Sequence, residues 1–206
     1  MSKLTSLAAV AALTLASFAT AQAAPEVSQP APDFTAVTAS GETLALTDLA
    51  GKTVILEWTN HLCPFVSKHY GSGNMQALQQ EMAGEDLVWL QVISSAPGRQ
   101  GYVEGDKAIG LNAERDAAPS DILMDPEGTI GRAYAARVTP HMYIIDPEGT
   151  LQYMGGIDSI ASANPADIDD ATNYVREAMA ALSAGQAVPN PVTRAYGCTI
   201  KYAPAS

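Results

Sequence analysis

The sequence predicts an α/β sandwich with a central mixed β-sheet flanked by helices. Three short apolar runs have the composition of strands buried on both faces, and they alternate with segments of helical character. These runs lie at residues 53–58, 87–93 and 121–124. Two more runs, at 141–145 and 151–154, flank Asp-Pro-Glu-Gly at 146–149, where proline and glycine favour a hairpin turn. Strands that alternate with helices, followed by a hairpin and a last helix, indicate this layered architecture.

The predicted helices are marked mainly at their ends. Pro64 suits the first turn of a helix, and the glycines of 71–73 interrupt that helix before it resumes over 74–82. Further helices are expected at 102–115 and 129–137.

The last helix has the best-marked start. Asn164 can cap it, Pro165 fits its first position, and Gly185 can end it. Its predicted apolar face comprises Ile168, Ala171, Val175, Met179 and Leu182.

Residues 1–23 have the pattern of a signal peptide. Lys3 is followed by an uncharged apolar run over 4–18 and by Ala-Gln-Ala at 21–23, the small-x-small triplet that signal peptidase accepts. The run is shorter than the about 20 apolar residues of a stable membrane anchor, although an anchor helix is the alternative. We therefore expect an exported, periplasmic protein without a membrane span after cleavage.

The rest of the chain is expected to form one domain and a tail. Residues 24–188 are assigned to the domain, and a small hairpin within 32–49 should extend its sheet. The tail, 189–206, carries Cys198. Its proline-rich approach and Gly197 suit a mobile arm that folds back onto the domain.

The charge of the chain disfavours some partners. It has 11 Lys and Arg against 22 Asp and Glu, a net charge of −11 that becomes −12 when Lys3 is removed with the leader. Nucleic acid and anionic lipid bind clusters of basic residues, so neither is expected as a partner. The chain has two cysteines, Cys63 and Cys198, which can pair as a disulfide in an oxidising compartment.

Cys63 is the candidate nucleophile. It follows the first buried run after four residues and directly precedes Pro64, so it should lie at the N-terminus of a helix. Unpaired N–H groups and the helix dipole favour the thiolate there, and the thiolate is the reactive form of cysteine. The alternative is an inert buried cysteine, since free cysteines are among the most buried residues.

Several segments together carry a resemblance to a known family. They are Ala31-Pro32-Asp33-Phe34, Asp-Leu-Ala-Gly-Lys at 48–52, the run at 53–58, Cys63-Pro64, and the stretch from Val138 to Asp146. In order and spacing, over residues 30–156, they resemble the redoxin branch of the thioredoxin-like superfamily, which includes the alkyl hydroperoxide reductase and thiol-specific antioxidant (AhpC/TSA) proteins. Cys-Pro-Phe-Val at Cys63 and Tyr-Gly-Cys-Thr-Ile-Lys-Tyr at 196–202 are similar to an exported bacterial subgroup. The resemblance implies a thioredoxin-like sandwich that acts as a thiol–disulfide oxidoreductase.

The resemblance also implies roles for residues around Cys63. Cys63 matches the first cysteine of the thioredoxin Cys-x-x-Cys motif, and Val66 stands where the second would be. Glu57 matches the buried acid that handles protons, and a carboxyl in an apolar strand should have a raised pKa; an ion pair at the sheet edge is the alternative. Thr139 and Pro140 match the cis-proline element beside the reactive sulfur. The substrate-docking surface is expected to comprise Trp58, Asn60, His61, Pro64, Thr139 and Pro140.

Cys198 becomes the natural partner of Cys63 once Val66 fills the second motif position. A mixed disulfide at Cys63 could be resolved by attack from Cys198. Alternatively, the two cysteines form a permanent structural clip, which would stabilise the fold by about 4–5 kcal/mol in the chain-entropy model, or no bond at all.

A peroxiredoxin-type thiol peroxidase with an antioxidant role is the first alternative function. Such enzymes resemble this chain but carry threonine three residues before the cysteine and arginine on a later strand. Here Asn60 occupies the threonine position, with Thr59 one residue too early, and Pro140 occupies the arginine position, although Arg137 could substitute. Peroxide activation needs donors directed at the peroxide oxygens, so these losses argue against efficient peroxidase activity.

A copper-binding or copper-delivery protein on the same fold is the second alternative. His61, Cys63 and His141 would form a thiolate–imidazole ligand set of the kind that copper and zinc accept. The simpler interpretation is that His61 tunes the thiol, His141 caps the site and His69 lies on a helix surface. On that interpretation no metal or cofactor is expected, and the partners are protein or small-molecule thiols and disulfides, or peroxides under the first alternative.

Overall fold

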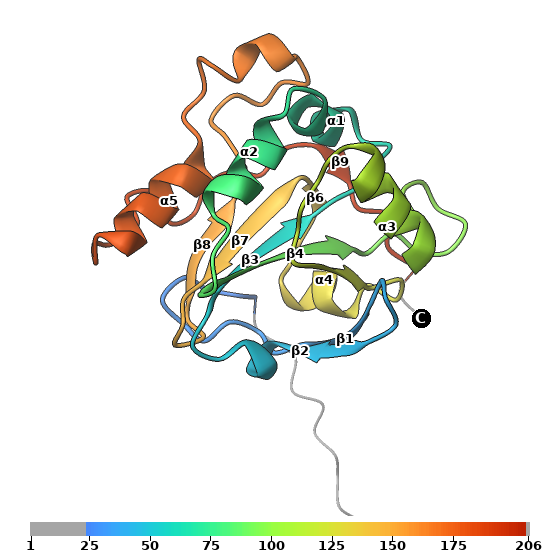
Figure 1. The fold of residues 1–206 in the computed structure, drawn as a ribbon, viewed down its shortest axis with the longest axis horizontal. Coiled ribbons are helices and arrows are strands. Elements are labelled where there is room, and N and C mark those ends of the chain that lie inside the picture. The colour runs from blue at the N-terminus through green and yellow to red at the C-terminus, as the bar shows by residue number, and fades with distance from the viewer. Residues whose placement is uncertain (1–23, 205–206) are drawn as a thin grey trace, which may run out of the picture.

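The computed structural model describes residues 24–204 and has a seven-stranded mixed sheet at its centre (Figure 1). The strand order is β2-β1-β5-β4-β3-β7-β8. The bounds are β1 Thr35–Thr38, β2 Thr43–Ala45, β3 Thr53–Trp58, β4 Leu87–Ile93, β5 Asp121–Met124, β7 His141–Ile145 and β8 Leu151–Gly155. The sheet, its helical layers and the added β1–β2 hairpin confirm the predicted thioredoxin-like α/β sandwich.

β3 lies in the middle of the sheet because its side chains are buried on both faces. It pairs in parallel with β4 and antiparallel with β7. After Thr53 every residue of the strand is buried, as its apolar and β-branched composition predicts. The carboxyl end of β3 therefore delivers the next turn, which carries Cys63, to the middle of the sheet edge.

Helices cover both faces of the sheet unequally. Elements on the first face are α1 Pro64–Gly71, α2 Asn74–Glu81, α3 Gly105–Glu114 and α5 Tyr174–Ser183. The second face carries the short helix α4, Thr129–Ala133, and the N-terminal segment with the 3₁₀ turn η1, Leu46–Leu49. Figure 1 shows α1, α2 and α3 above the strands, and α4 with the β1–β2 hairpin below them.

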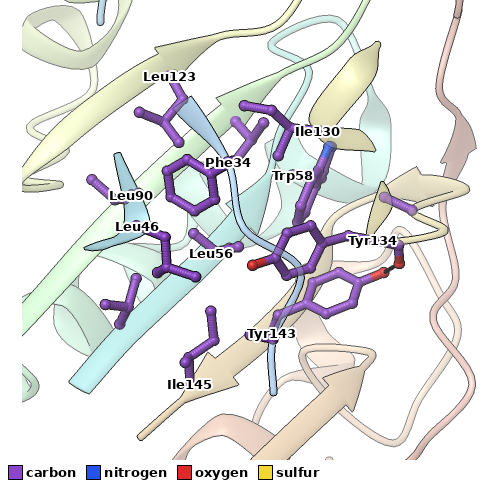
Figure 2. Packing of buried hydrophobic residues seen from close by; sticks show 14 of the residues in the cluster. Phe34, Leu46, Leu56, Trp58, Leu90, Leu123, Ile130, Tyr134, Tyr143 and Ile145 are labelled. Carbon is purple, nitrogen blue, oxygen red and sulfur yellow. Dashed lines mark hydrogen bonds between the residues drawn. The ribbon is translucent and has the colours of Figure 1, made fainter. Parts of the chain in front are cut away.

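The second face is filled by an aromatic cluster (Figure 2). Trp58, Tyr134 and Tyr143 are fully buried, and their ring centroids lie 5.0 to 5.5 Å apart. Aromatic pairs of this kind contribute about 0.5–1.5 kcal/mol each beyond their burial. The cluster gives β3 and β7 a well-packed support on the face opposite Cys63.

The last helix begins later than the sequence predicts. Asn164 does cap a helical turn, accepting from the N–H of Ala166 at 3.2 Å, but that turn is only the 3₁₀ segment η2, Pro165–Asp167. α5 starts after a second cap, Asn173, whose Oδ1 accepts from Arg176 N at 3.0 Å. The prediction of one continuous helix was therefore wrong, because two capping signals lie nine residues apart and the second one starts the helix that packs on the sheet.

The C-terminal tail folds back onto the domain, as its sequence suggested. Its strand β9, Cys198–Thr199, pairs antiparallel with β6, Val138–Thr139. Tyr196 and Ile200 on either side are buried, with 8% and 6% exposure. We call residues 196–202 the C-terminal strap.

The predicted signal peptide, 1–23, lies outside the described residues. Within residues 24–204, every helix is too short or too polar to cross a membrane.

Candidate redox site at Cys63

Cys63 lies at the N-terminus of α1, as predicted. A turn connects β3 to Cys63. In this turn, Cys63 N donates to Asn60 O at 3.0 Å and Leu62 N donates to Asn60 Oδ1 at 2.9 Å. Cys63 is the N-cap residue of α1, with an extended backbone, and Pro64 occupies the first helical turn. Cys63 thus lies at the positive end of the helix dipole, although its side chain makes no capping hydrogen bond to the helix.

The Cys63 thiol is enclosed by the protein. It has no exposed surface, and its Sγ donates to the carbonyl oxygen of Thr139 at 3.1 Å. The Thr139–Pro140 peptide bond is cis, in agreement with the match to the cis-proline element. Val66, at the position of a second motif cysteine, is 1% exposed and packs in the same apolar cluster as Cys63.

Cys198 is brought to the same carbonyl by strand pairing. Its Cα is registered opposite Thr139 in the β6–β9 ladder, and it packs against the cluster that contains Cys63. Both cysteines are free, and Cys198 is only partly buried. Burial, followed by interaction with the neighbouring Cys63 thiol and its charge, raises the pKa of Cys198 to about 12. Cys198 therefore stays protonated at neutral pH while the pair is reduced.

Gly197 lets the C-terminal strap lie directly on Thr139. Its φ is +141°, and a Cβ built on it would overlap the Thr139 carbonyl group. Only glycine combines this backbone conformation with so close an approach. The position of Cys198 thus depends on the residue before it.

Glu57 is fully buried on the same face of the sheet as Cys63. Its carboxylate accepts from the Tyr70 hydroxyl at 2.7 and 3.0 Å and from Trp89 Nε1 at 2.9 Å. Burial raises the pKa of Glu57, while the charge of Arg115 and these hydrogen bonds oppose the rise. The raised pKa agrees with the prediction for a carboxyl in an apolar strand, and β3 lies in the sheet centre rather than at its edge.

A polar network that the sequence did not predict surrounds Tyr70. Gln91 Nε2 donates to the Tyr70 hydroxyl, and Asn112 Nδ2 donates to Gln91 Oε1 at 2.8 Å. Arg115 donates to Asn112 Oδ1 and stacks on Tyr70, with Cζ 3.6 Å from the ring centroid. These residues come from α1, β4 and α3, so only the tertiary fold brings them together.

The residues predicted to line the docking surface are divided between the two faces. Thr139, Pro140, Pro64 and Asn60 adjoin Cys63, and Asn60 is held in the turn that precedes it. Trp58 is instead a core residue of the opposite face, with Nε1 donating to Ser94 Oγ at 3.0 Å.

The histidines are also dispersed. His141 pairs with Trp58 across β3 and β7 and stacks on Tyr143 at 4.6 Å, on the face opposite Cys63. His69 was expected on a helix surface but is fully buried. His61 is partly exposed in the turn before Cys63. Across residues 24–204, no three His, Cys, Asp or Glu side chains are grouped so that they could hold a metal ion.

Comparisons with known proteins agree with this geometry. The family model described as AhpC/TSA matches residues 27–154. The thioredoxin-like protein YneN of Bacillus subtilis is 31% identical over 124 residues, which are 60% of this chain and 68% of YneN. A hypothetical protein from Sinorhizobium meliloti 1021 superposes with a TM-score of 0.75 at 21% identity, covering 89% of this chain and 98% of that one. The thioredoxin domain of a thiol-disulfide oxidoreductase from Bacteroides vulgatus gives a TM-score of 0.50 at 15% identity, with 70% and 96% coverage.

Proposed function

The chain belongs to the AhpC/TSA family, and from this premise we propose that it is a thiol–disulfide oxidoreductase whose reactive pair is Cys63 and Cys198. One observation carries the proposal: both sulfur-bearing residues meet at the backbone of Thr139, Cys63 through its thiol and Cys198 through strand pairing. Residues 135 positions apart in the sequence have no other evident reason to converge on one carbonyl at a helix N-terminus.

The proposed cycle begins at Cys63. Its thiolate attacks a substrate disulfide, forms a mixed disulfide with one sulfur, and releases the other as a thiolate. Cys198 then loses its proton and attacks the Cys63 sulfur, so that the second substrate thiolate leaves and a Cys63–Cys198 disulfide remains. Two electrons pass from the protein to the substrate, and an external dithiol restores the reduced pair by the reverse exchange.

The raised pKa of Cys198 supports this order of events. Burial is the largest cause and persists, but the Cys63 hydrogen bond and the Cys63 charge also raise this pKa, and both disappear when the Cys63 sulfur enters a mixed disulfide. The pKa of Cys198 should therefore fall once Cys63 has reacted. Glu57, with its raised pKa, is the proposed proton acceptor for the second attack.

Intact-mass spectrometry tests the proposal directly. The reduced protein is equilibrated with glutathione buffers of graded ratio, quenched in acid and alkylated, beside Cys63→Ser and Cys198→Ser variants. A disulfide that forms and breaks across these buffers supports the proposal, and Cys198→Ser should accumulate a glutathione adduct on Cys63. A pair that never oxidises, or one that oxidises once and then resists millimolar dithiol, contradicts it.

Peroxide is a separate substrate to be tested with the same variants. Asn60 has no hydroxyl to match the threonine of thiol peroxidases, and its Oδ1 accepts from Leu62 N, while Arg137 is exposed and is not a buried substitute for the missing arginine. We therefore expect Cys63 to form sulfenic acid no faster than a free peptide thiol. An exported location remains our prediction from residues 1–23.

A further inference from the structure

The C-terminal strap is held by a buried polar cluster that the redox chemistry does not itself require. Asp158, in the segment between β8 and η2, is 3% exposed and accepts hydrogen bonds from two different elements. Its Oδ2 accepts from Lys68 Nζ at 3.1 Å, and its Oδ1 accepts from the Tyr196 hydroxyl. We call Lys68, His69, Asp158 and Tyr196 the Asp158 clamp.

The clamp joins the helix of one cysteine to the strap of the other. Lys68 and His69 lie on α1, whose N-cap is Cys63, and Tyr196 lies two residues before Cys198. The Tyr196 ring also packs edge-on against Phe65, two residues after Cys63, with ring centroids 5.8 Å apart. Asp158 itself contacts neither thiol, so any effect on the cysteines must pass through Tyr196.

His69 completes the clamp in its neutral form. Asn74 Nδ2 donates to His69 Nδ1 at 2.9 Å, which leaves the ring proton on Nε2. That nitrogen lies 3.4 Å from the Tyr196 hydroxyl and 3.7 Å from Asp158 Oδ2. Lys68 Nζ also donates to the carbonyl oxygen of Ile160 at 3.4 Å, so two acceptors fix the position of the buried ammonium group.

Stability alone is a weak reason for such a cluster. Taking a lysine and a carboxylate out of water is costly, and well-packed apolar side chains of similar volume often serve stability as well. A hydrogen-bonded ion pair differs from apolar contacts in having one favourable geometry. The clamp can therefore fix the register of the C-terminal strap, which apolar packing of Tyr196 on Phe65 alone would leave free to shift.

We propose that Tyr196, through its hydrogen bond to Asp158, is a positioning residue that holds Cys198 in register with Cys63 for closure of the disulfide. This inference rests on the proposed redox function of the pair. Removing the Tyr196 hydroxyl keeps the ring on Phe65 but releases the strap from Asp158. The effective concentration of Cys198 at Cys63 should then fall by about tenfold, which corresponds to about 1.4 kcal/mol.

The test compares Tyr196→Phe with wild type and with Tyr134→Phe. Tyr134 is a matched control because its buried ring also donates one hydroxyl, to Pro32 O at 2.7 Å, but lies on the opposite face. The equilibrium constant for the Cys63–Cys198 disulfide against glutathione is measured for each variant, together with the melting temperature of the reduced form. We expect a tenfold fall for Tyr196→Phe, an unchanged constant for Tyr134→Phe, and comparable losses of thermal stability.

The outcomes separate the two proposals. If wild type forms no reversible disulfide, the proposed function fails whatever the variants do. If wild type cycles but Tyr196→Phe keeps its equilibrium constant, the positioning role is refuted and the redox function stands. A second measurement, alkylation of Cys63 in a Cys198→Ser background, should show about tenfold faster labelling with Tyr196→Phe, and equal rates would also refute the role.

Discussion

Replacing Gly197 by alanine should detach the C-terminal strap from Thr139 and expose Cys63. A non-glycine residue held in a sparsely populated backbone conformation costs about 1–3 kcal/mol. The new methyl group would also overlap the Thr139 carbonyl, and overpacking against atoms that cannot move costs about 1–3 kcal/mol more. Keeping the strap in place would therefore cost about 2–6 kcal/mol.

The strain is present only while the strap is closed, because opening the strap removes the contact between residue 197 and the Thr139 carbonyl. The β6–β9 ladder pairs only two residues of each strand, and each hydrogen bond contributes about 0.5–1.5 kcal/mol net. A difference of at least about 1.4 kcal/mol in favour of opening raises the open population about tenfold. Cys63, which has no exposed surface when the strap is closed, should become accessible in the same proportion.

Alkylation of Cys63 by iodoacetamide measures this population. The experiment uses a Cys198→Ser background, so that mass spectrometry scores Cys63 alone. Gly149→Ala is the matched control, since Gly149 has a φ of +81° but open space around its Cβ position, in the β7–β8 turn. We expect at least tenfold faster labelling with Gly197→Ala than with Gly149→Ala. Equal rates would refute the idea that the strap covers the thiol.

Two further predictions concern buried titratable groups. Glu57→Gln should slow disulfide closure at pH 7 by tenfold or more, and an unchanged closure rate would refute the role of Glu57 as proton acceptor. Because burial raises the pKa of Glu57, the same substitution should stabilise the reduced protein against denaturant at pH 8 but not at pH 4. Burial holds the pKa of His69 at about 4 against 6.5 in the unfolded chain, so this group contributes stability above pH 6.5 that is lost as the pH falls toward 4, by at most about 3 kcal/mol. Urea unfolding of His69→Gln between pH 7 and pH 4 should show a correspondingly shallower loss than wild type, and parallel curves would contradict the assignment.

Sequence patterns predicted the sheet because its strands carry their own signal. The run at 53–58 is apolar along its whole length, and the structure buries it on both faces. Pro64 likewise marked the start of α1 and so the place of Cys63. The last helix was misplaced because Asn164 and Asn173 are equally good caps, and only packing against the sheet decides which of them starts the longer helix.

The site was predicted less completely than the fold. Thr139 was placed beside Cys63 because a family resemblance supplied the topology, and Cys198 was paired with Cys63 because Val66 fills the second motif position. The Asp158 clamp was missed because its members are up to 128 residues apart and because a lone lysine or aspartate is normally a surface residue. The tail was expected to fold back from its prolines and Gly197, and the apolar side chains of Tyr196, Ile200 and Tyr202 were an additional sign of how closely it packs.

The strap explains how one thiol can be both buried and reactive. Cys63 has no exposed surface and Cys198 packs against its cluster, so we expect a thiol or disulfide to reach Cys63 when the strap moves. The strap is fixed before Cys198 by Tyr196 on Asp158 and after it by Ile200 N, which donates to Arg137 O at 3.0 Å. Further along the strap, Lys201 O accepts from Ala96 N at 2.9 Å and the Tyr202 hydroxyl donates to Ala136 O at 2.8 Å. The contacts that bring Cys198 to Cys63 therefore also limit how often Cys63 is accessible to a substrate. Weakening these anchors should make closure of the Cys63–Cys198 disulfide less favourable and, at the same time, make Cys63 more accessible.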